Sequence, residues 1–173
     1  MSEAAVAIVL RPRETLELLL IKRAEHETDP WSGHMALPGG RRDPADGDLL
    51  DTAIRETCEE TGLCLDSRCR MGALDEVTPG TRRLPPLVIA PFVMAARPEA
   101  TAHADPSEVE AAIWVPLPAL ADEAAAGELI LQLEGGPRSF PTYNYGEYVI
   151  WGLTHRILRQ FLELAEDAGL TRS

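Results

Sequence analysis

Three glutamates, Glu56, Glu59 and Glu60, lie three and four residues apart in a stretch that reads RETCEETG from residue 55 to residue 62. At about 100° per residue, a helix places their side chains within one arc of roughly 100°. Like charges at this spacing destabilise a helix by about 0.2–0.5 kcal/mol per pair. The pattern therefore indicates either a solvated acidic helix face or a cation site, since hard divalent cations prefer oxygen ligands. The Gly39-Gly40 turn upstream favours the metal site.

The segment around these glutamates resembles the Nudix box, G-x5-E-x7-R-E-U-x-E-E-x-G-U, in which U is a bulky apolar residue. The residues that fit are Arg55, Glu56, Glu59, Glu60, Gly62 and Leu63. Thr57 stands at the first U, and the spacing from Gly40 to Arg55 is one residue longer than in the standard box. Gly47 stands where the early Glu is expected, between Asp46 and Asp48, so that role is either absent or taken by an aspartate.

The resemblance implies an α+β fold, the Nudix-type α/β/α sandwich with a mixed β-sheet, formed by a single domain over residues 1–173. It also implies Mg²⁺ or Mn²⁺, held by Glu56, Glu59, Glu60 and the backbone carbonyl of Gly40. The implied reaction is hydrolysis of a diphosphate linkage in a small molecule, in which water attacks one phosphorus and a phosphate monoester leaves. Divalent ions neutralise the phosphate oxygens and lower the pKa of the attacking water.

Other residues are candidates for catalysis and binding. Arg55 lies four residues before Glu59 and can orient it, while the general base is either a helix glutamate, Glu56 or Glu59, or a residue from a distant loop. Glu147 is the main loop candidate, and Glu108 and Glu76 are alternatives. Arginine binds phosphate in a bidentate manner and aromatic rings stack on bases, although each such residue can equally be a surface or packing residue. The substrate-binding candidates are Arg41, Arg42, Arg82, Arg83 and Tyr145, with Trp31 and Tyr143 as further stacking residues.

The segment before the box is similar to that of the coenzyme A diphosphatase branch of the Nudix family, which carries LLTxR and later FPGG. The matching residues are Leu19, Leu20, Arg23, Gly33, Pro38, Gly39 and Gly40. Ile21 and Leu37 depart from the branch pattern, and so do Asp29 and Trp31, which stand for an Arg and a His. The resemblance thus implies coenzyme A or an acyl-CoA as a candidate substrate. ADP-ribose or another nucleoside diphosphate derivative is the alternative, and a catalytically silent nucleotide-binding module is a second one.

The composition of the chain limits the kinds of binding partner that we expect. The 173 residues carry a net charge of −12, which disfavours nucleic acid and anionic membrane surfaces as partners. No apolar run is long enough to span a bilayer, and we expect no signal peptide, so we predict a cytoplasmic protein. Cys58, Cys64 and Cys69 have no metal-ligand spacing and are expected to be free thiols in a reducing compartment. The family resemblance also allows a homodimer.

The apolar periodicity predicts the elements that must position these residues. Pro91 should place its strand at a sheet edge or at a bulge. Asp51 is the expected N-cap of the box helix, and Gly62 its left-handed C-cap. A hairpin is expected around residues 11–15. The predicted strands are Ala4–Leu10, Leu16–Ile21, Cys69–Val77, Leu87–Ala95, Glu108–Val115, Glu128–Leu133 and Phe140–Tyr145, and the predicted later helices are Ala119–Ala126 and Ile150–Ala168.

Overall fold

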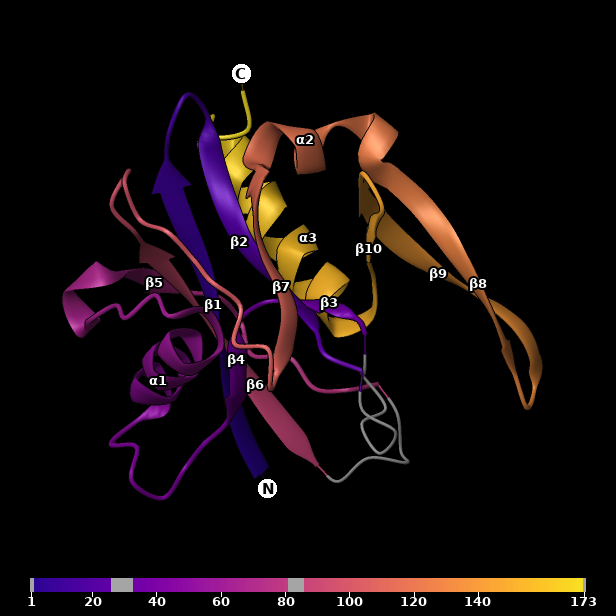
Figure 1. Ribbon diagram of the computed structural model, residues 1–173. Coiled ribbons are helices and arrows are strands. Elements are labelled where there is room, and N and C mark those ends of the chain that lie inside the picture. The colour runs from indigo at the N-terminus through magenta and orange to yellow at the C-terminus, as the bar shows by residue number, and fades with distance from the viewer. Residues whose placement is uncertain (1, 26–32, 81–85, 173) are drawn as a thin grey trace.

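The computed structural model describes residues 2–25, 33–80 and 86–172, and its centre is a mixed β-sheet (Figure 1). The strands of this sheet are β1 (Ser2–Pro12), β2 (Leu16–Arg23), β3 (Met35–Ala36), β4 (Gly39–Arg41), β5 (Arg70–Ala73), β6 (Leu87–Ala95) and β7 (Val109–Pro116). The order is β3-β2-β1-β6-β5, with β4 paired to β1 and β7 paired to β2. Among the described strands, only β1 and β6 run parallel, over nine residue pairs, and the predicted β1–β2 hairpin is present.

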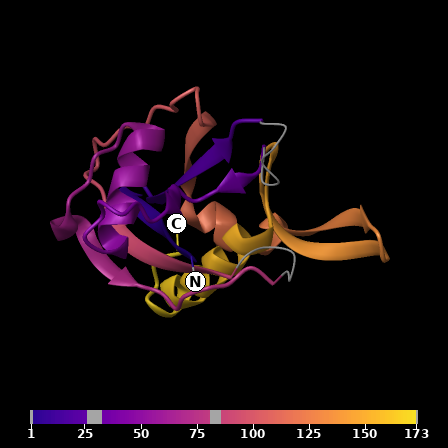
Figure 2. The same cartoon turned by 90° about the horizontal axis from the view of Figure 1, so that it is seen from below.

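Helices cover both faces of this sheet, as Figures 1 and 2 show. Helix α1 (Leu49–Thr61) packs on one face, and α2 (Leu117–Ala121) and α3 (Gly152–Asp167) pack on the other. Side chains alternate between the faces of β1, so Ala5 and Ala7 belong to the α1 core while Ile8 and Leu10 belong to the α3 core. The predicted α/β/α sandwich with a mixed sheet is confirmed.

Helix α1 carries the acidic cluster, and its N-terminus differs from the prediction. The helix begins at Leu49, and its N-cap is Asp48, whose carboxylate accepts a hydrogen bond from the Asp51 N–H at 2.9 Å. The prediction that Asp51 caps the helix was therefore wrong by one turn. The C-cap prediction is confirmed, because Gly62 has φ 68° and its N–H donates to the Cys58 carbonyl.

The cysteine prediction was wrong for two of the three residues. A disulfide joins Cys58 and Cys64, with 4.4 Å between their Cα atoms, while Cys69 is a free thiol. The left-handed Gly62 reverses the chain at the end of α1, which brings Cys64 back beside the last helical turn. The prediction of free thiols rested on the odd number of cysteines, which does not show that two of them are paired locally.

Pro91 does not mark a sheet edge, because β6 lies between β1 and β5. The Pro91 carbonyl accepts a hydrogen bond from the Leu74 N–H, one residue past the end of β5. The N–H and C=O of a strand residue point to the same side. An N–H at position 91 would therefore point toward β5, at the place where the ladder between β5 and β6 ends. The interior strand thus tolerates the proline without losing a ladder hydrogen bond.

Two other predicted elements are shorter than expected. The strand predicted over Cys69–Val77 is β5, Arg70–Ala73, followed by an isolated bridge between Val77 and Ile89. The helix predicted over Ala119–Ala126 is α2, Leu117–Ala121, followed by a 3₁₀ turn, Glu123–Ala125, that begins at the N-cap Asp122.

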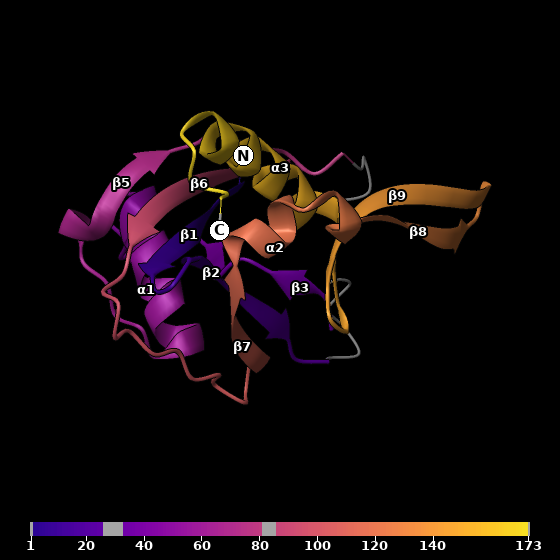
Figure 3. The ribbon, with the colours of Figure 1, turned by 90° about the horizontal axis from the view of Figure 1, so that it is seen from above.

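A second, three-stranded sheet stands apart from the central one. Its strands are β8 (Ala126–Leu133), β9 (Gly136–Tyr145) and β10 (Tyr148–Ile150), in the order β10-β9-β8. The predicted strand pair is confirmed as the β8–β9 hairpin, which projects away from the body (Figures 1 and 3). No helix in the described part of the chain is long and apolar enough to cross a membrane.

Candidate active site

Three carboxylate groups lie close together in the structure. One oxygen from each of Glu56, Glu60 and Glu108 lies within 4.8 Å of the others. Glu56 and Glu60 come from adjacent turns of α1, and Glu108 comes from the loop before β7. Such a group of oxygen ligands, two of them on a rigid helix, has the composition of a Mg²⁺ or Mn²⁺ site.

Backbone hydrogen bonds bring Glu108 to this cluster. The carbonyls of Glu60 and Thr61 at the end of α1 accept from the N–H groups of Asp105 and His103, at 3.0 and 2.8 Å. The Glu108 carbonyl in turn accepts from the Ala24 N–H at the end of β2. The last carbonyls of a helix have no partner within the helix, so here they fasten the loop that carries the third carboxylate.

The glycine turn fits closely around the helix glutamates. A Cβ atom at Gly40 would lie 2.5 Å and 2.7 Å from the two carboxylate oxygens of Glu56, so only glycine leaves room for this side chain. A Cβ atom at Gly39 would lie 2.7 Å from the Cα of Val6 in β1. The Gly39 N–H also donates to the Glu60 carboxylate at 3.2 Å. Close backbone approach therefore explains both glycines.

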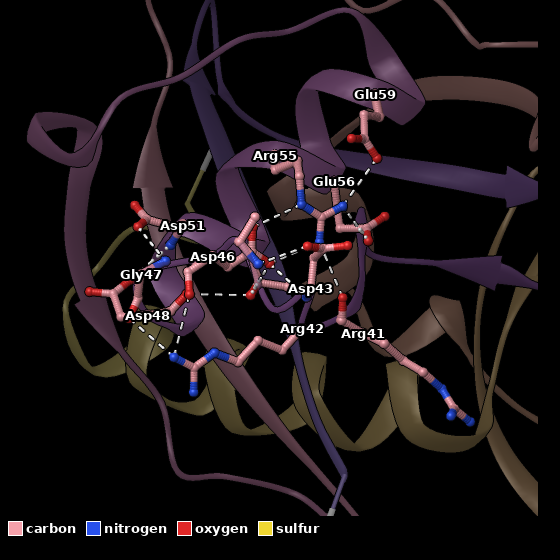
Figure 4. Close-up of polar contacts among 12 residues, drawn as sticks. Arg41, Arg42, Asp43, Asp46, Gly47, Asp48, Asp51, Arg55, Glu56 and Glu59 are labelled. Carbon is pink, nitrogen blue, oxygen red and sulfur yellow. Dashed lines mark hydrogen bonds and ion pairs between the residues drawn. The ribbon is translucent and has the colours of Figure 1, made fainter.

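Asp46, one residue before the position where the early glutamate is expected, pairs with Arg55 (Figure 4). Its two carboxylate oxygens accept from Nε and Nη2 of Arg55, each at 2.9 Å, in a bidentate pair. Asp46 also accepts from the Thr52 hydroxyl and the Asp43 N–H. The remaining Nη1 of Arg55 donates to Glu56 at 2.9 Å. Asp46 thus fixes an arginine that positions a metal-ligand candidate.

Glu59 lies outside the three-carboxylate group. Its side chain is 53% exposed, and its carboxylate accepts from Arg55 Nη1 at 3.2 Å, as the i,i+4 spacing predicts. Figure 4 shows it on the helix turn beyond Arg55. The position leaves Glu59 free to face solvent next to the cluster, and its role as a ligand or base stays a prediction.

The electrostatics of the cluster favour a bound cation. Glu60 is 4% exposed, and this burial, together with the charges of Glu56 and Glu108, raises its pKa to about 8. Burial also raises the pKa of Glu56, although the hydrogen bond from Arg55 opposes the shift. In contrast, the same arginine holds the pKa of Asp46 well below its usual range. A divalent cation would compensate the two buried carboxylates that have raised pKa values.

The predicted phosphate-binding arginines have different surroundings. The Arg41 carbonyl accepts from Arg55, while the Arg41 guanidinium points away from the carboxylates in Figure 4. Arg42 pairs with Glu3 at 2.9 Å and donates to the Gly47 carbonyl, so it also holds the loop before α1. Arg82 and Arg83 lie outside the described residues, as do Asp29 and Trp31.

Two of the predicted site residues, a substrate-binding candidate and a general-base candidate, lie at the β9–β10 strand pair that precedes α3. Tyr145, in β9, pairs with Tyr148 and packs against the core of the α3 face. Glu147 is exposed in the turn between β9 and β10, where its charge acts on Lys22 at the end of β2. Glu147 is not part of the three-carboxylate group formed by the described residues.

Glu108 was only an alternative candidate for the base in the sequence, and the sequence left open whether Asp46 or Asp48 takes the role of the early glutamate. The Pro-Ser-Glu-Val run at 106–109 was a usable signal, since it places a glutamate immediately before a strand. For Asp46, the sequence contained the neighbouring acidic residues but not the loop conformation. That conformation aims Asp46 at Arg55 and Asp48 at the helix N-terminus.

Comparisons with known proteins agree with the fold. The NUDIX domain family model matches residues 1–133. The chain is 31% identical, over 183 aligned residues, to the human mitochondrial coenzyme A diphosphatase NUDT8, covering 98% of this chain and 76% of that protein. It is 42% identical over 104 residues to an uncharacterized protein of Schizosaccharomyces pombe, covering 58% of this chain and only 32% of that longer protein.

A solved structure shows the same fold. The MutT/nudix family protein from Enterococcus faecalis superimposes with a TM-score of 0.69 at 19% identity, covering 96% of this chain and 62% of that chain. The chain belongs to the Nudix family. It is therefore a Nudix hydrolase, the class of enzymes that acts on diphosphate linkages.

Proposed function

We propose that this enzyme hydrolyses the diphosphate linkage of a nucleoside diphosphate derivative, with coenzyme A or an acyl-CoA as its substrate. The observation that carries the proposal is the group of Glu56, Glu60 and Glu108 within 4.8 Å beside the glycine turn. The choice of coenzyme A is supported by the similarity to NUDT8 along almost the whole chain. It is also supported by the residues shared with that branch between Leu19 and Gly40.

Mg²⁺ or Mn²⁺ fits the donor set, and Glu56, Glu60, Glu108 and the Gly40 carbonyl would hold it, with Glu59 close by. When bound, the ion neutralises phosphate oxygens and lowers the pKa of the attacking water. Arg55 keeps Glu56 in place, and the Gly39 N–H keeps Glu60 in place. The protein's own contribution is thus a rigid carboxylate frame, which is what phosphoryl transfer needs most.

Three glutamates are candidates for the general base. Glu108 and Glu59 are exposed at the cluster, while Glu147 is exposed on a separate turn. A base must reach the water directly or through one further water. We therefore propose Glu108 or Glu59 before Glu147. A general base is inactive when protonated, so loss of the acidic limb of the pH–rate profile in Glu108→Gln or in Glu59→Gln will distinguish them.

A substrate panel tests the function. Coenzyme A, acetyl-CoA, ADP-ribose and a dinucleoside polyphosphate are incubated with the enzyme and Mg²⁺ or Mn²⁺, and the phosphate monoester products are identified by mass spectrometry. We expect the fastest turnover for coenzyme A or its thioester, with two monoesters as products, one of which carries the pantetheine half. Faster turnover of ADP-ribose would reassign the substrate while leaving the reaction class unchanged.

A variant experiment tests the metal site separately. Glu60→Gln keeps the shape of the side chain but removes its charge, so we expect kcat to fall by about two to four orders of magnitude. Glu110→Gln is the matched control, because Glu110 is an exposed glutamate of β7 that pairs with Lys22 outside the cluster. Nucleotide binding without turnover in the wild-type protein, with no dependence on metal, would instead identify a silent binding module.

We also propose a cytoplasmic location for the enzyme. The support is the acidic composition and the lack of a membrane-spanning helix among the described residues. The cytoplasm is reducing, so the Cys58–Cys64 disulfide of the structure would be subject to reduction there. Alkylation of intact cells followed by mass spectrometry of the 58–64 segment will measure the fraction that is paired.

A further inference from the structure

The β8–β9 hairpin has one edge that pairs with nothing in the described part of the chain. Strand β8 contacts β9 along all eight of its residues, and the sheet order β10-β9-β8 leaves its other side open. The same strand exposes large apolar side chains, with Ile130 at 64% and Leu133 at 44% exposure. An open edge with apolar side chains is a template for pairing with another strand.

The two edges of the hairpin are not equivalent. Proline has no N–H, so Pro137 and Pro141 cannot donate hydrogen bonds to β8. The two prolines therefore occupy positions of β9 that face away from β8, and they interrupt that outer edge. The ladder between the strands must therefore use the alternate residues of β9. As a result, the N–H and C=O groups of Glu128, Ile130 and Gln132 point to the open side of β8, which contains no proline and no lysine. Only one edge of the arm is blocked against strand addition.

The open edge is complementary to itself. Two copies of β8 can run antiparallel with Ile130 opposite the Ile130 of the other copy. This register places Glu128 opposite Gln132 and Leu129 opposite Leu131, so no like charges meet and apolar residues face apolar residues. Figures 2 and 3 show the arm extending clear of the helices and the central sheet, which gives a second molecule access to its edge.

We propose that a second copy of this chain binds along β8, which forms a homodimer through a continuous antiparallel sheet centred on Ile130. A strand pair of this length covers less surface than a standard stable interface. The dimer should therefore dissociate on dilution, and sedimentation velocity over a concentration series should show a monomer–dimer equilibrium. A wild-type protein that stays monomeric up to its solubility limit would overturn the proposal.

A crosslink tests the position of the twofold axis. Residues that directly face each other in an antiparallel hydrogen-bonded pair have Cα atoms about 5.5 Å apart, within the range that a disulfide spans. Ile130→Cys should give a reducible covalent dimer under mild oxidation. Met71→Cys is the matched control, because Met71 is also 64% exposed but lies in β5, and it should remain a monomer on a non-reducing gel. Equal crosslinking of the two variants would reject the proposed interface.

A charge change tests the register. In the proposed pairing, Gln132→Lys places an ammonium group opposite Glu128 of the other copy twice per dimer, whereas Gln132→Glu places a carboxylate there. Two such pairs should change the dissociation constant by about two- to thirtyfold, with Lys tightening and Glu weakening the dimer at low salt. No change, or changes of the opposite sign, would show that β8 is not paired in this register.

Discussion

The Asp46 carboxylate accepts two hydrogen bonds from Arg55, nine residues later in the chain. One comes from Nε and the other from Nη2, each at 2.9 Å. Gly47, the next residue, stands where the box is expected to carry a glutamate and has no side chain that could make such a pair. The Asp46 side chain is 6% exposed and the Arg55 side chain is 29% exposed, so much of both charged groups is shielded from water. The frame of the active site therefore depends on a residue that lies outside the ligand-carrying helix, two residues before its N-cap Asp48.

Asp46→Ala should weaken both stability and catalysis, because it leaves Arg55 without its main partner. We expect a loss of about 1–3 kcal/mol in the free energy of unfolding, since a buried charged group loses its hydrogen bonds. We also expect kcat to fall by at least about tenfold, as a misplaced ligand loses its productive geometry. Chemical denaturation and steady-state kinetics measure the two effects.

Asp43→Ala is the control for this variant, because Asp43 is exposed and lies in the same loop. A positioning role also predicts a higher Mg²⁺ concentration for half-maximal activity in Asp46→Ala. If stability falls but metal dependence and kcat do not change, Asp46 is merely a structural residue of the loop.

Gly40→Ala should abolish metal binding while leaving the fold largely intact. The added methyl group would lie 2.5–2.7 Å from the Glu56 carboxylate oxygens, so Glu56 has to leave its position. We expect loss of Mn²⁺ binding by calorimetry and a fall in kcat of about a hundredfold or more. Gly72→Ala is the matched strand glycine, since its Cβ would meet nothing within 4 Å, and it should bind Mn²⁺ normally.

The stability of the metal-free protein should fall as pH rises between about 4.5 and 8. Glu60 has an ordinary pKa of 4.5 and a folded-state pKa of about 8, so the fold favours its neutral form. The stability from this preference is complete below pH 4.5 and is lost as pH rises through about 8. Thermal unfolding in the presence of EDTA, compared between wild type and Glu60→Gln, isolates this residue.

Metal should act against that pH dependence, because cation binding requires the charged carboxylate. Mn²⁺ affinity measured by calorimetry should increase over the same pH range, and saturating Mn²⁺ should reduce or reverse the fall in unfolding temperature. An affinity that does not change with pH in the wild-type protein would place the ion away from Glu60.

Reduction of the Cys58–Cys64 disulfide should destabilise the end of α1. Closing a loop with a sequence separation of 6 restricts the unfolded chain, and such a short loop contributes about 2 kcal/mol in the chain-entropy model. For a protein of this size the unfolding temperature should fall by about 4–8 °C in reductant. Cys69→Ser, which removes the free thiol, should respond to reductant as the wild type does.

Much of the fold followed from local patterns. The spacing of Glu56 and Glu60 predicted their common helix face, Gly62 predicted the helix end, and short apolar runs predicted β1 and β2. These features depend on residues that are close in sequence, so propensity and periodicity are enough to find them. The wider architecture, an α/β/α sandwich with a mixed sheet, came from the family resemblance and not from periodicity.

The remaining features depend on long-range contacts. Glu108 joins the cluster only because Asp105 and His103 donate to the last carbonyls of α1, more than forty residues earlier in the chain. Pro91 is tolerated inside the sheet only because β5 stops opposite it. A single sequence does not reveal where such segments meet, and these were the points at which the predictions were incomplete or wrong.

Glu60 is fastened at two places, since its carboxylate accepts from Gly39 and its backbone carbonyl accepts from Asp105. One residue thereby links the glycine turn, the box helix and the loop that carries Glu108. Substitution of Glu60 therefore removes a contact of the glycine turn as well as a metal-ligand candidate. Adaptation to a different ion or substrate would have to proceed through Glu108 and Glu59, whose side chains are exposed and can change without disturbing the core.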